Sequence, residues 1–226
     1  MFSVAIDGLA GCGKSSLALG LSKNLNFRYF NTGAMYRGIT CEYLRRFGET
    51  QPNEEIISQL LENLDVKIVF NGDEQRVIVN NIDQTPNLRK EIVSNMTPFV
   101  SGYENLRDKV RDLQRDFAKE HNCIMEGRDI GSVVLKDADV KIYLTASSEE
   151  RAKRRFAQME NDPARPAYEE ILKDIKQRDE VDKSREHGKL LVPQDAVIVD
   201  NSNFTLEQTI SYCEKLIKDK MQQELK

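Results

Sequence analysis

The sequence predicts an α/β fold, in which short buried strands alternate with helices along the chain. Three observations support this prediction. Apolar segments of strand type recur along the chain, helical apolar patterns lie between most of them, and a glycine-rich loop joins the first strand to the first helix. The strand-type segments are residues 2–7, 27–30, 123–125, 140–145 and 196–200.

Length and composition fit one globular unit, since 39% of the 226 residues are hydrophobic. The apolar runs are far shorter than a membrane span, and Met1 leads straight into the first strand without a signal segment. Four scattered cysteines and two histidines suggest neither a zinc site nor a disulfide scaffold. The net charge of -4 argues against a general nucleic-acid binder. We expect a cytoplasmic monomer without membrane or nucleic-acid partners.

The loop after the first strand matches the phosphate-binding pattern G-x-x-x-x-G-K-[ST]. It reads Gly8-Leu9-Ala10-Gly11-Cys12-Gly13-Lys14-Ser15 and is followed by Ser16. Glycines let the backbone wrap around phosphate oxygens, and the start of a helix attracts anions. We therefore expect a nucleoside triphosphate, with Lys14 on its β- and γ-phosphates and Ser15 on Mg²⁺. A glycine-rich turn that binds nothing is the alternative, and the flanking strand and helix argue against it.

The second strand is followed by the segment Asn31-Thr32-Gly33-Ala34-Met35-Tyr36-Arg37. Thr32 and Arg37 thus stand just beyond the carboxyl end of a strand, where open α/β sheets bind ligands. The alternative is a helix cap at Thr32 and a solvated arginine at Arg37.

The spacing of apolar residues then changes from a helical to a strand-type pattern, which interrupts the alternation of strand and helix. Residues 66–79 alternate in the strand manner around Asn71-Gly72-Asp73, which indicates a β-hairpin. We interpret residues 63–85 as a β insert over the acceptor side of the cleft. Residues 1–62 and 86–226 then form the core of a single compact unit.

A mainly helical region follows, up to about residue 119, and carries Arg107, Arg111 and Arg115 at every fourth position. We expect Arg111 and Arg115 to form a solvated basic face. The next strand ends in Glu126-Gly127-Arg128-Asp129-Ile130-Gly131. Charges packed so tightly after a strand indicate a site, although a plain turn built on the two glycines is the alternative.

Residues 151–190 form a charged helical segment broken near Asn161-Asp162-Pro163. This composition is typical of a mobile lid over a phosphate site. The segment carries Arg154 and Arg155 in its first half, and Arg178, Asp182 and Arg185 in its second.

Arginines from separate segments indicate what receives the phosphate. Guanidinium groups bind phosphate in a bidentate manner, so several of them suit two phosphorylated ligands. A phosphate acceptor is already ionised near neutral pH and needs no general base, whereas an alcohol acceptor would need one. The arginines are Arg37, Arg128, Arg154, Arg155, Arg178 and Arg185.

Together these motifs make the chain similar to the bacterial-type cytidylate kinases over nearly its whole length. The likeness rests on Ile6-Asp7-Gly8 with the phosphate loop, on residues 32–37, 127–131 and 147–155, and on Arg178-Asp179 with Asp182 and Arg185. It implies a parallel five-stranded sheet flanked by helices, the fold of the P-loop nucleoside monophosphate kinases, with a small antiparallel β insert and a helical lid. It also implies phosphoryl transfer from ATP to CMP or dCMP, assisted by Mg²⁺.

The resemblance also implies roles for individual residues. Arg37, Arg128 and Arg185 would hold the acceptor phosphate, and Arg178 and Asp182 its sugar, with Thr32 nearby. Arg107 and Asp129 would read the cytosine, whose amino group suits a carboxylate and whose ring acceptors suit a guanidinium. Lys14, Arg128, Asp129, Arg154 and Arg155 would act in catalysis.

Two departures concern base selection. Asn31 stands where the family commonly has Asp, and Thr97-Pro98 where a serine touching the base is expected. Discrimination against UMP can therefore differ from the family norm. The alternatives are a UMP or AMP kinase, a non-catalytic ATP-binding switch, and a kinase of small alcohols.

Overall fold

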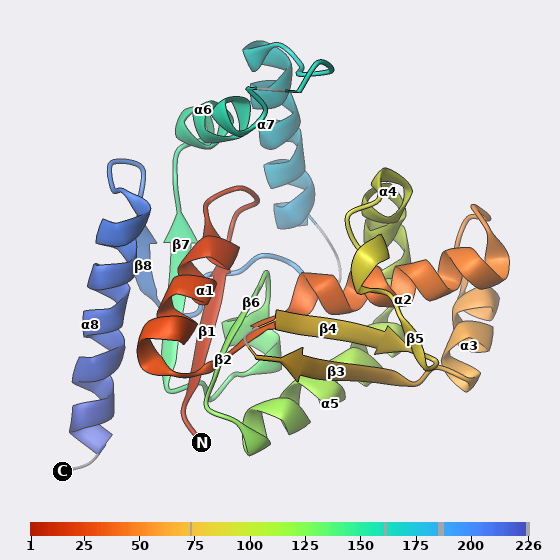
Figure 1. The fold of residues 1–226 in the computed structure, drawn as a ribbon, viewed down its shortest axis with the longest axis horizontal. Coiled ribbons are helices and arrows are strands. Elements are labelled where there is room, and N and C mark those ends of the chain that lie inside the picture. The colour runs from red at the N-terminus through yellow and green to blue at the C-terminus, as the bar shows by residue number, and fades with distance from the viewer. Residues whose placement is uncertain (73, 161, 185–187, 225–226) are drawn as a thin grey trace.

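The computed structural model describes residues 1–72, 74–160, 162–184 and 188–224 (Figure 1). Its strands are β1 Ser3–Gly8, β2 Arg28–Asn31, β3 Val66–Asn71, β4 Glu74–Val79, β5 Ile82–Asp83, β6 Cys123–Gly127, β7 Val140–Thr145 and β8 Val197–Asp200. Its α-helices are α1 Lys14–Leu25, α2 Thr32–Phe47, α3 Glu54–Glu62, α4 Glu91–Val100, α5 Glu104–Glu120, α6 Ser148–Gln158, α7 Tyr168–Ser184 and α8 Leu206–Glu224. Short helical turns cover Thr85–Asn87 and Ile130–Val134, the second of them π-helical.

Five parallel strands form the main sheet, in the order β2-β6-β1-β7-β8. The central strand β1 pairs with β6 on one side and with β7 on the other. The chain therefore leaves β1 in one direction and returns on its other side, which creates a topological switch point beyond the carboxyl end of β1. The predicted α/β class and five-stranded parallel sheet are confirmed.

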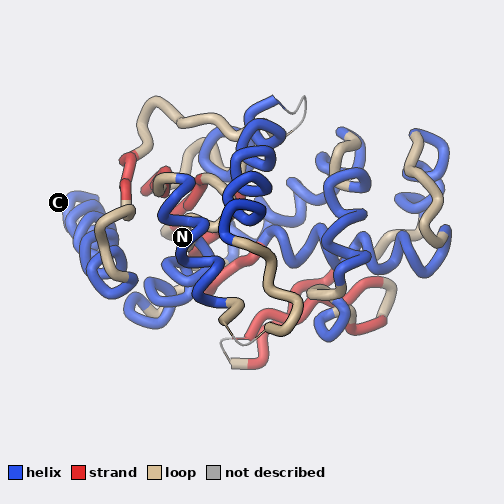
Figure 2. The backbone as a smooth tube through the Cα atoms, turned by 90° about the horizontal axis from the view of Figure 1, so that it is seen from above, coloured by secondary structure: helices blue, strands red, loops and turns tan. Residues whose placement is uncertain are grey.

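Alternation of buried side chains along β1 divides the core into two layers. Val4 and Ile6 pack with α1 and α8, whereas Ala5 packs with residues of α2, α4 and α5 on the opposite face. In both views, α8 lies at one end of the molecule and α3 at the other (Figure 1, Figure 2). The sheet is thus covered on both faces, as parallel sheets require.

A second, antiparallel sheet contains β3, β4 and β5. It contacts the end of β2 through Gln75, whose side chain accepts from the Asn31 N–H at 2.6 Å and donates to the Asn31 carbonyl at 3.2 Å. The expected hairpin is present, although Asp73 of its turn lies outside the described residues. This small sheet is therefore fixed to the chain segment that leads into α2.

Helices α6 and α7 pack on each other above the carboxyl ends of β1 and β7 (Figure 1). Ala152, Ile171 and Ile175 form a small apolar cluster between them, separate from the two layers of the main core. Within the part of the chain that the structure describes, no helix is long and apolar enough to cross a membrane.

Candidate active site

The phosphate-binding loop depends on glycine at both ends. Gly8 has φ +151°, and a Cβ atom there would lie 2.0 Å from the carbonyl oxygen of Leu144. Gly13 precedes α1 with φ +95°, in the left-handed region that favours glycine, and offers no side-chain cap. The loop therefore passes close to β7 and leaves the first N–H groups of α1 to face an anion.

Lys14 is the first residue of α1, and its side chain turns back over the loop. Its Nζ donates to the carbonyl oxygens of Gly8 at 2.9 Å and Leu9 at 2.7 Å, and the residue is only 5% exposed. Burial lowers the pKa of Lys14, because the ammonium form loses its hydration. The ammonium group thus lies inside the loop, where a phosphate oxygen could replace a carbonyl as its partner.

Ser15 lies beside a carboxylate that the sequence predictions did not include among the site residues. Its hydroxyl donates to Glu126 Oε1 at 2.7 Å, and the Tyr29 hydroxyl donates to the same oxygen at 3.0 Å. Asn31 Nδ2 in turn donates to the Tyr29 hydroxyl at 3.0 Å. Burial raises the pKa of Tyr29, so its hydroxyl keeps its proton and remains a donor.

The oxygens of Ser15 and Glu126 fit a magnesium ion, which prefers hard oxygen donors. Among the described residues, no cluster of three or more His, Cys, Asp or Glu forms an all-protein metal cage. Such a cage is not what Mg²⁺ needs, because it commonly takes one or two protein oxygens together with waters and phosphate oxygens.

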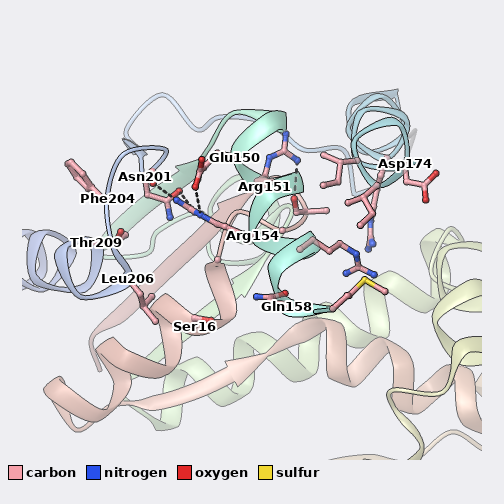
Figure 3. Close-up of a pocket in the computed structure, with 18 of the residues that line it drawn as sticks. Ser16, Glu150, Arg151, Arg154, Gln158, Asp174, Asn201, Phe204, Leu206 and Thr209 are labelled. Atoms are coloured by element: carbon pink, nitrogen blue, oxygen red, sulfur yellow. Dashed lines mark hydrogen bonds and ion pairs between the residues drawn. The ribbon is translucent and has the colours of Figure 1, made fainter. Parts of the chain in front are cut away.

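A cavity of about 570 Å³ opens between the phosphate loop, α6, α7 and the segment before α8 (Figure 3). Its volume lies in the range of small-molecule sites. The residues of the predicted site that line it are Ala10, Gly11, Gly13, Ser16, Arg154, Arg155 and Arg178. Arg178 thus lines the same cavity as the phosphate loop and the two arginines of α6.

Asn201 connects this cavity to the loop. Its side-chain nitrogen donates to the carbonyl of Cys12 at 3.0 Å, and Arg154 donates to its backbone and side-chain oxygens at 2.7 and 3.2 Å (Figure 3). Asn201 is buried, so its bond to Cys12 is shielded from water. Contacts within the protein therefore hold Arg154 near the loop.

A second group of charged side chains lies at the carboxyl end of β6, outside this cavity. Arg107 Nη2 donates to Asp129 Oδ2 at 2.6 Å, and its guanidinium lies 5.3 Å from the centre of the Tyr36 ring. Both members of the ion pair are buried. These two residues, 22 positions apart in the chain and both expected from the resemblance to contact the base, thus lie next to each other.

Arg128 extends from the end of β6 toward α7, where its Nε donates to Asp182 Oδ2 at 2.8 Å. Thr32 donates its hydroxyl to the carbonyl oxygen of Glu126 at 2.8 Å, while Asn31, not Thr32, caps α2. Arg37 is half-buried and, within the described ranges, has no hydrogen-bond or ion-pair partner. Arg185 lies outside the described residues.

One sequence-based expectation is wrong. Arg115 is not part of a solvated face, since its Nε donates to the carbonyl of Val134 at 2.9 Å and its Nη2 to that of Val133 at 3.0 Å. Arg111 does form a surface ion pair, with Asp108 at 2.8 Å. Helical spacing shows only which face a residue occupies, and it does not show that α5 lies beside the turn after β6.

For several residues around the site, no individual role was predicted from the sequence. Arg151 was hidden among the arginines of α6, and Asp7 and Glu126 stand at strand ends that are also glycine-rich. Asn201 and Tyr29 belong to no recognised pattern. The usable signal for Asp7 and Glu126 was their charge at the end of an otherwise apolar buried strand.

Fold and site together define a P-loop kinase: a parallel sheet with the phosphate loop after its central strand, and arginines on both sides of that loop. Comparison with known proteins narrows this class. The family model described as Cytidylate kinase matches residues 4–219.

Two curated relatives carry the same name. A cytidylate kinase of Clostridium botulinum strain Langeland is 38% identical, covering 96% of this chain and 97% of that protein. A cytidylate kinase of Caldicellulosiruptor saccharolyticus is 40% identical, covering 92% of each chain. The chain therefore belongs to the cytidylate kinase family.

A solved structure supports the fold alone. It is an uncharacterized protein from Eubacterium ventriosum, 11% identical, with a TM-score of 0.53 and coverage of 96% of this chain and 99% of that chain.

Proposed function

We propose that the chain transfers the terminal phosphoryl group of ATP to CMP or dCMP, which yields ADP and CDP or dCDP. Membership of the cytidylate kinase family supports this reaction. The structural observation that carries the proposal is the buried Arg107–Asp129 pair. It presents a cationic donor beside a carboxylate acceptor, which complements the ring acceptors and amino group of cytosine.

The donor site is formed by the phosphate loop and the adjoining cavity. We assign the triphosphate of ATP to the loop, with Lys14 contacting its β- and γ-phosphates, and the rest of the nucleotide to the cavity. Arg154 and Arg155 neutralise charge on the transferred group. Arg178 was assigned to the acceptor sugar by resemblance, but its place in the cavity lining supports a contact with phosphate instead.

The metal site uses Ser15 and Glu126. Their oxygens lie 2.7 Å apart at the start of α1, next to the expected phosphates, and would hold Mg²⁺ together with phosphate oxygens and water. When bound, Mg²⁺ neutralises charge on the β- and γ-phosphates. Tyr29 orients the Glu126 carboxylate through its own hydrogen bond.

The acceptor site lies at the carboxyl ends of β2 and β6. Arg37 and Arg128 bind the acceptor phosphate, and the half-buried Arg37 gains there the anionic partner it lacks among the described residues. Asp182 binds the sugar after exchanging its ion pair with Arg128 for the ligand. Asp129 Oδ1 receives the cytosine amino group while Oδ2 keeps Arg107.

Chemically, an oxygen of the acceptor phosphate attacks the γ-phosphorus, and the bond from that phosphorus to the β–γ bridging oxygen breaks as ADP leaves. The acceptor oxygen is already ionised near neutral pH, since its second pKa is about 6. No general base is required. Placement and charge stabilisation by Lys14 and the arginines therefore supply the catalysis.

Residues 151–190 act as the lid of this site, and residues 63–85 as the β insert of its acceptor side. The separate apolar cluster of α6 and α7 supports movement of these helices as a unit. The contact of Gln75 with Asn31 supports a role for the insert in placing α2. A monomeric state, a cytoplasmic location and the absence of a nucleic-acid partner stay predictions.

A label-transfer experiment tests the reaction. The purified chain is incubated with ATP labelled in its γ-phosphate, Mg²⁺ and CMP, and the products are separated by chromatography. We expect the label in CDP. Label released as inorganic phosphate, with CMP unchanged, would contradict the proposal and favour an ATP-hydrolysing switch.

A further inference from the structure

The segment that carries Arg128 and Asp129 continues directly into the π-helical turn Ile130–Val134. Turns of this type are rare and often occur at functional sites. Asp129 is the residue before this turn, and its carbonyl accepts from the N–H groups of Val133 and Val134 at 2.9 and 3.1 Å. The backbone of Asp129 therefore moves with the turn.

A buried carboxylate holds the amino-terminal end of the turn. Asp7 Oδ1 accepts from the Ile130 N–H at 2.8 Å, and Oδ2 from the Gly131 N–H at 2.7 Å. Asp7 is 2% exposed, so water does not compete for these bonds. The peptide N–H of Ile130 belongs to the bond that leaves Asp129, and Asp7 thus fixes the orientation of that peptide.

A guanidinium holds the carboxyl-terminal end. Arg115 of α5 donates to the carbonyl oxygens of Val133 and Val134, which are left without partners where the turn ends. A negative charge thus lies at the start of the turn and a positive charge at its end, the arrangement that complements a helix dipole. Asp7 of β1 and Arg115 of α5 therefore hold opposite ends of the turn.

We propose that Asp7 and Arg115 are positioning residues for base selection: they fix the π-helical turn and, through it, the Asp129 carboxylate that meets the cytosine amino group. They act through Asp129. The proposal rests on the proposed function, because it assumes that Asp129 reads the acceptor base.

Substitution at each end of the turn tests the proposal. Arg115→Gln removes the fork that holds two carbonyls, and Asp7→Asn replaces one acceptor oxygen by a donor that cannot pair with an N–H group. We expect either change to narrow the ratio of kcat/KM for CMP to kcat/KM for UMP by roughly tenfold, because the carboxylate no longer fits the amino group closely. This ratio does not depend on the fraction of protein that folds.

The two ends differ in their surroundings, which separates base selection from ATP binding. Asp7 interacts electrostatically with Lys14 of the phosphate loop. The hydrogen bonds of Arg115 go to the π-helical turn, at Val133 and Val134. We therefore expect Arg115→Gln to leave the KM for ATP within about twofold of the wild type. Arg115→Lys should recover part of the CMP preference, since an ammonium group can donate to the same carbonyls.

Lys119→Gln is the matched control, because Lys119 lies one turn further along α5 in an exposed ion pair with Asp116. It should leave the CMP-to-UMP ratio unchanged. An equal loss on both acceptors in the Arg115 and Asp7 variants, an unchanged ratio, or the same narrowing in the control would overturn the proposal. A wild type without preference for CMP would instead overturn the base assignment itself, before any variant is compared.

Discussion

Arg151 and Asp179 form a bidentate ion pair, with Nη1 to Oδ1 at 2.9 Å and Nη2 to Oδ2 at 2.6 Å. The same guanidinium donates to the carbonyl of Ala10 in the phosphate loop and to that of Ala146 before α6, both at 3.0 Å. Arg151 is almost completely buried. One side chain therefore joins α6, α7 and the phosphate loop, and the position of both helices over the loop depends on it.

Removal of one partner from this pair should destabilise the protein strongly. Arg151→Ala leaves the Asp179 carboxylate and two carbonyl groups without their donor, at a cost of about 3–5 kcal/mol in the free energy of unfolding. Urea denaturation measures this loss. Lys119→Ala, which breaks a surface pair, is the control and should change stability by less than about 1 kcal/mol. A similar small loss in both variants would mean that the Arg151 pair does not hold the two helices.

Loss of the loop lysine should remove activity while leaving the fold intact. Lys14→Met keeps the buried aliphatic stem but not the charge that faces the developing phosphate anion. We expect a fall of about a hundredfold or more in kcat, with little change in melting temperature. Steady-state kinetics and thermal unfolding of the same preparation give both quantities. Wild-type turnover in this variant would exclude Lys14 from the mechanism.

Arg37 should matter for the acceptor and not for ATP. Its half-buried guanidinium has no partner within the described ranges, and burial lowers its pKa by disfavouring the charged form. Arg37→Met should raise the KM for CMP by about tenfold or more and leave that for ATP nearly unchanged. Arg45→Met, at an exposed arginine of the same helix, is the control. Equal effects on both substrates would refute the assignment to the acceptor phosphate.

Asp7 makes stability depend on pH. Burial raises the pKa of Asp7 to about 6, although the two N–H groups that it accepts oppose this shift. Between about pH 4 and pH 6 the folded chain thus retains a proton that the unfolded chain releases, so the free energy of unfolding falls as pH rises through this window. The contribution is on the order of 3 kcal/mol at 1.36 kcal/mol per pKa unit.

Comparison with Asp7→Asn isolates this contribution, because the amide does not titrate. The stability of the wild type relative to the variant should fall between pH 4 and pH 7, as measured by urea denaturation at both values. A relative stability that rises or stays constant over this range would show that the carboxyl is not raised in the folded state.

The sequence predicted what is local and missed what is brought together by the fold. The phosphate loop and the strands around it were recognisable because their pattern occupies adjacent residues. Arg115 was misjudged because its partner Val133 lies 18 residues away, and the partners of Asp7 lie more than 120 residues away. Asn201 was missed for the same reason, since its side chain bonds to the backbone of Cys12, which lies 189 residues away in the chain. Such contacts follow from the order of strands in the sheet, which a single sequence does not display.

Base reading is the intermediate case. The side-chain chemistry of Arg107 and Asp129 already matched the hydrogen-bonding groups of cytosine. Only the structure shows that α5 brings Arg107 to within 2.6 Å of Asp129, and that Tyr36 lies against the guanidinium. The proposed magnesium site differs again, because the motif indicated Ser15 of α1, whereas its neighbour in the structure, Glu126, belongs to β6, 111 residues further along the chain.

The acceptor preference of the wild-type chain tests the central claim most directly. ADP release is measured with Mg–ATP and CMP, dCMP, UMP or AMP in turn, and kcat/KM is compared. If Asp129 receives the cytosine amino group, CMP should exceed UMP by roughly ten- to a hundredfold, because the uracil carbonyl sets an acceptor against the carboxylate. AMP should be poorer still. A preference for UMP or AMP, or ADP release that does not depend on any monophosphate, would contradict the account.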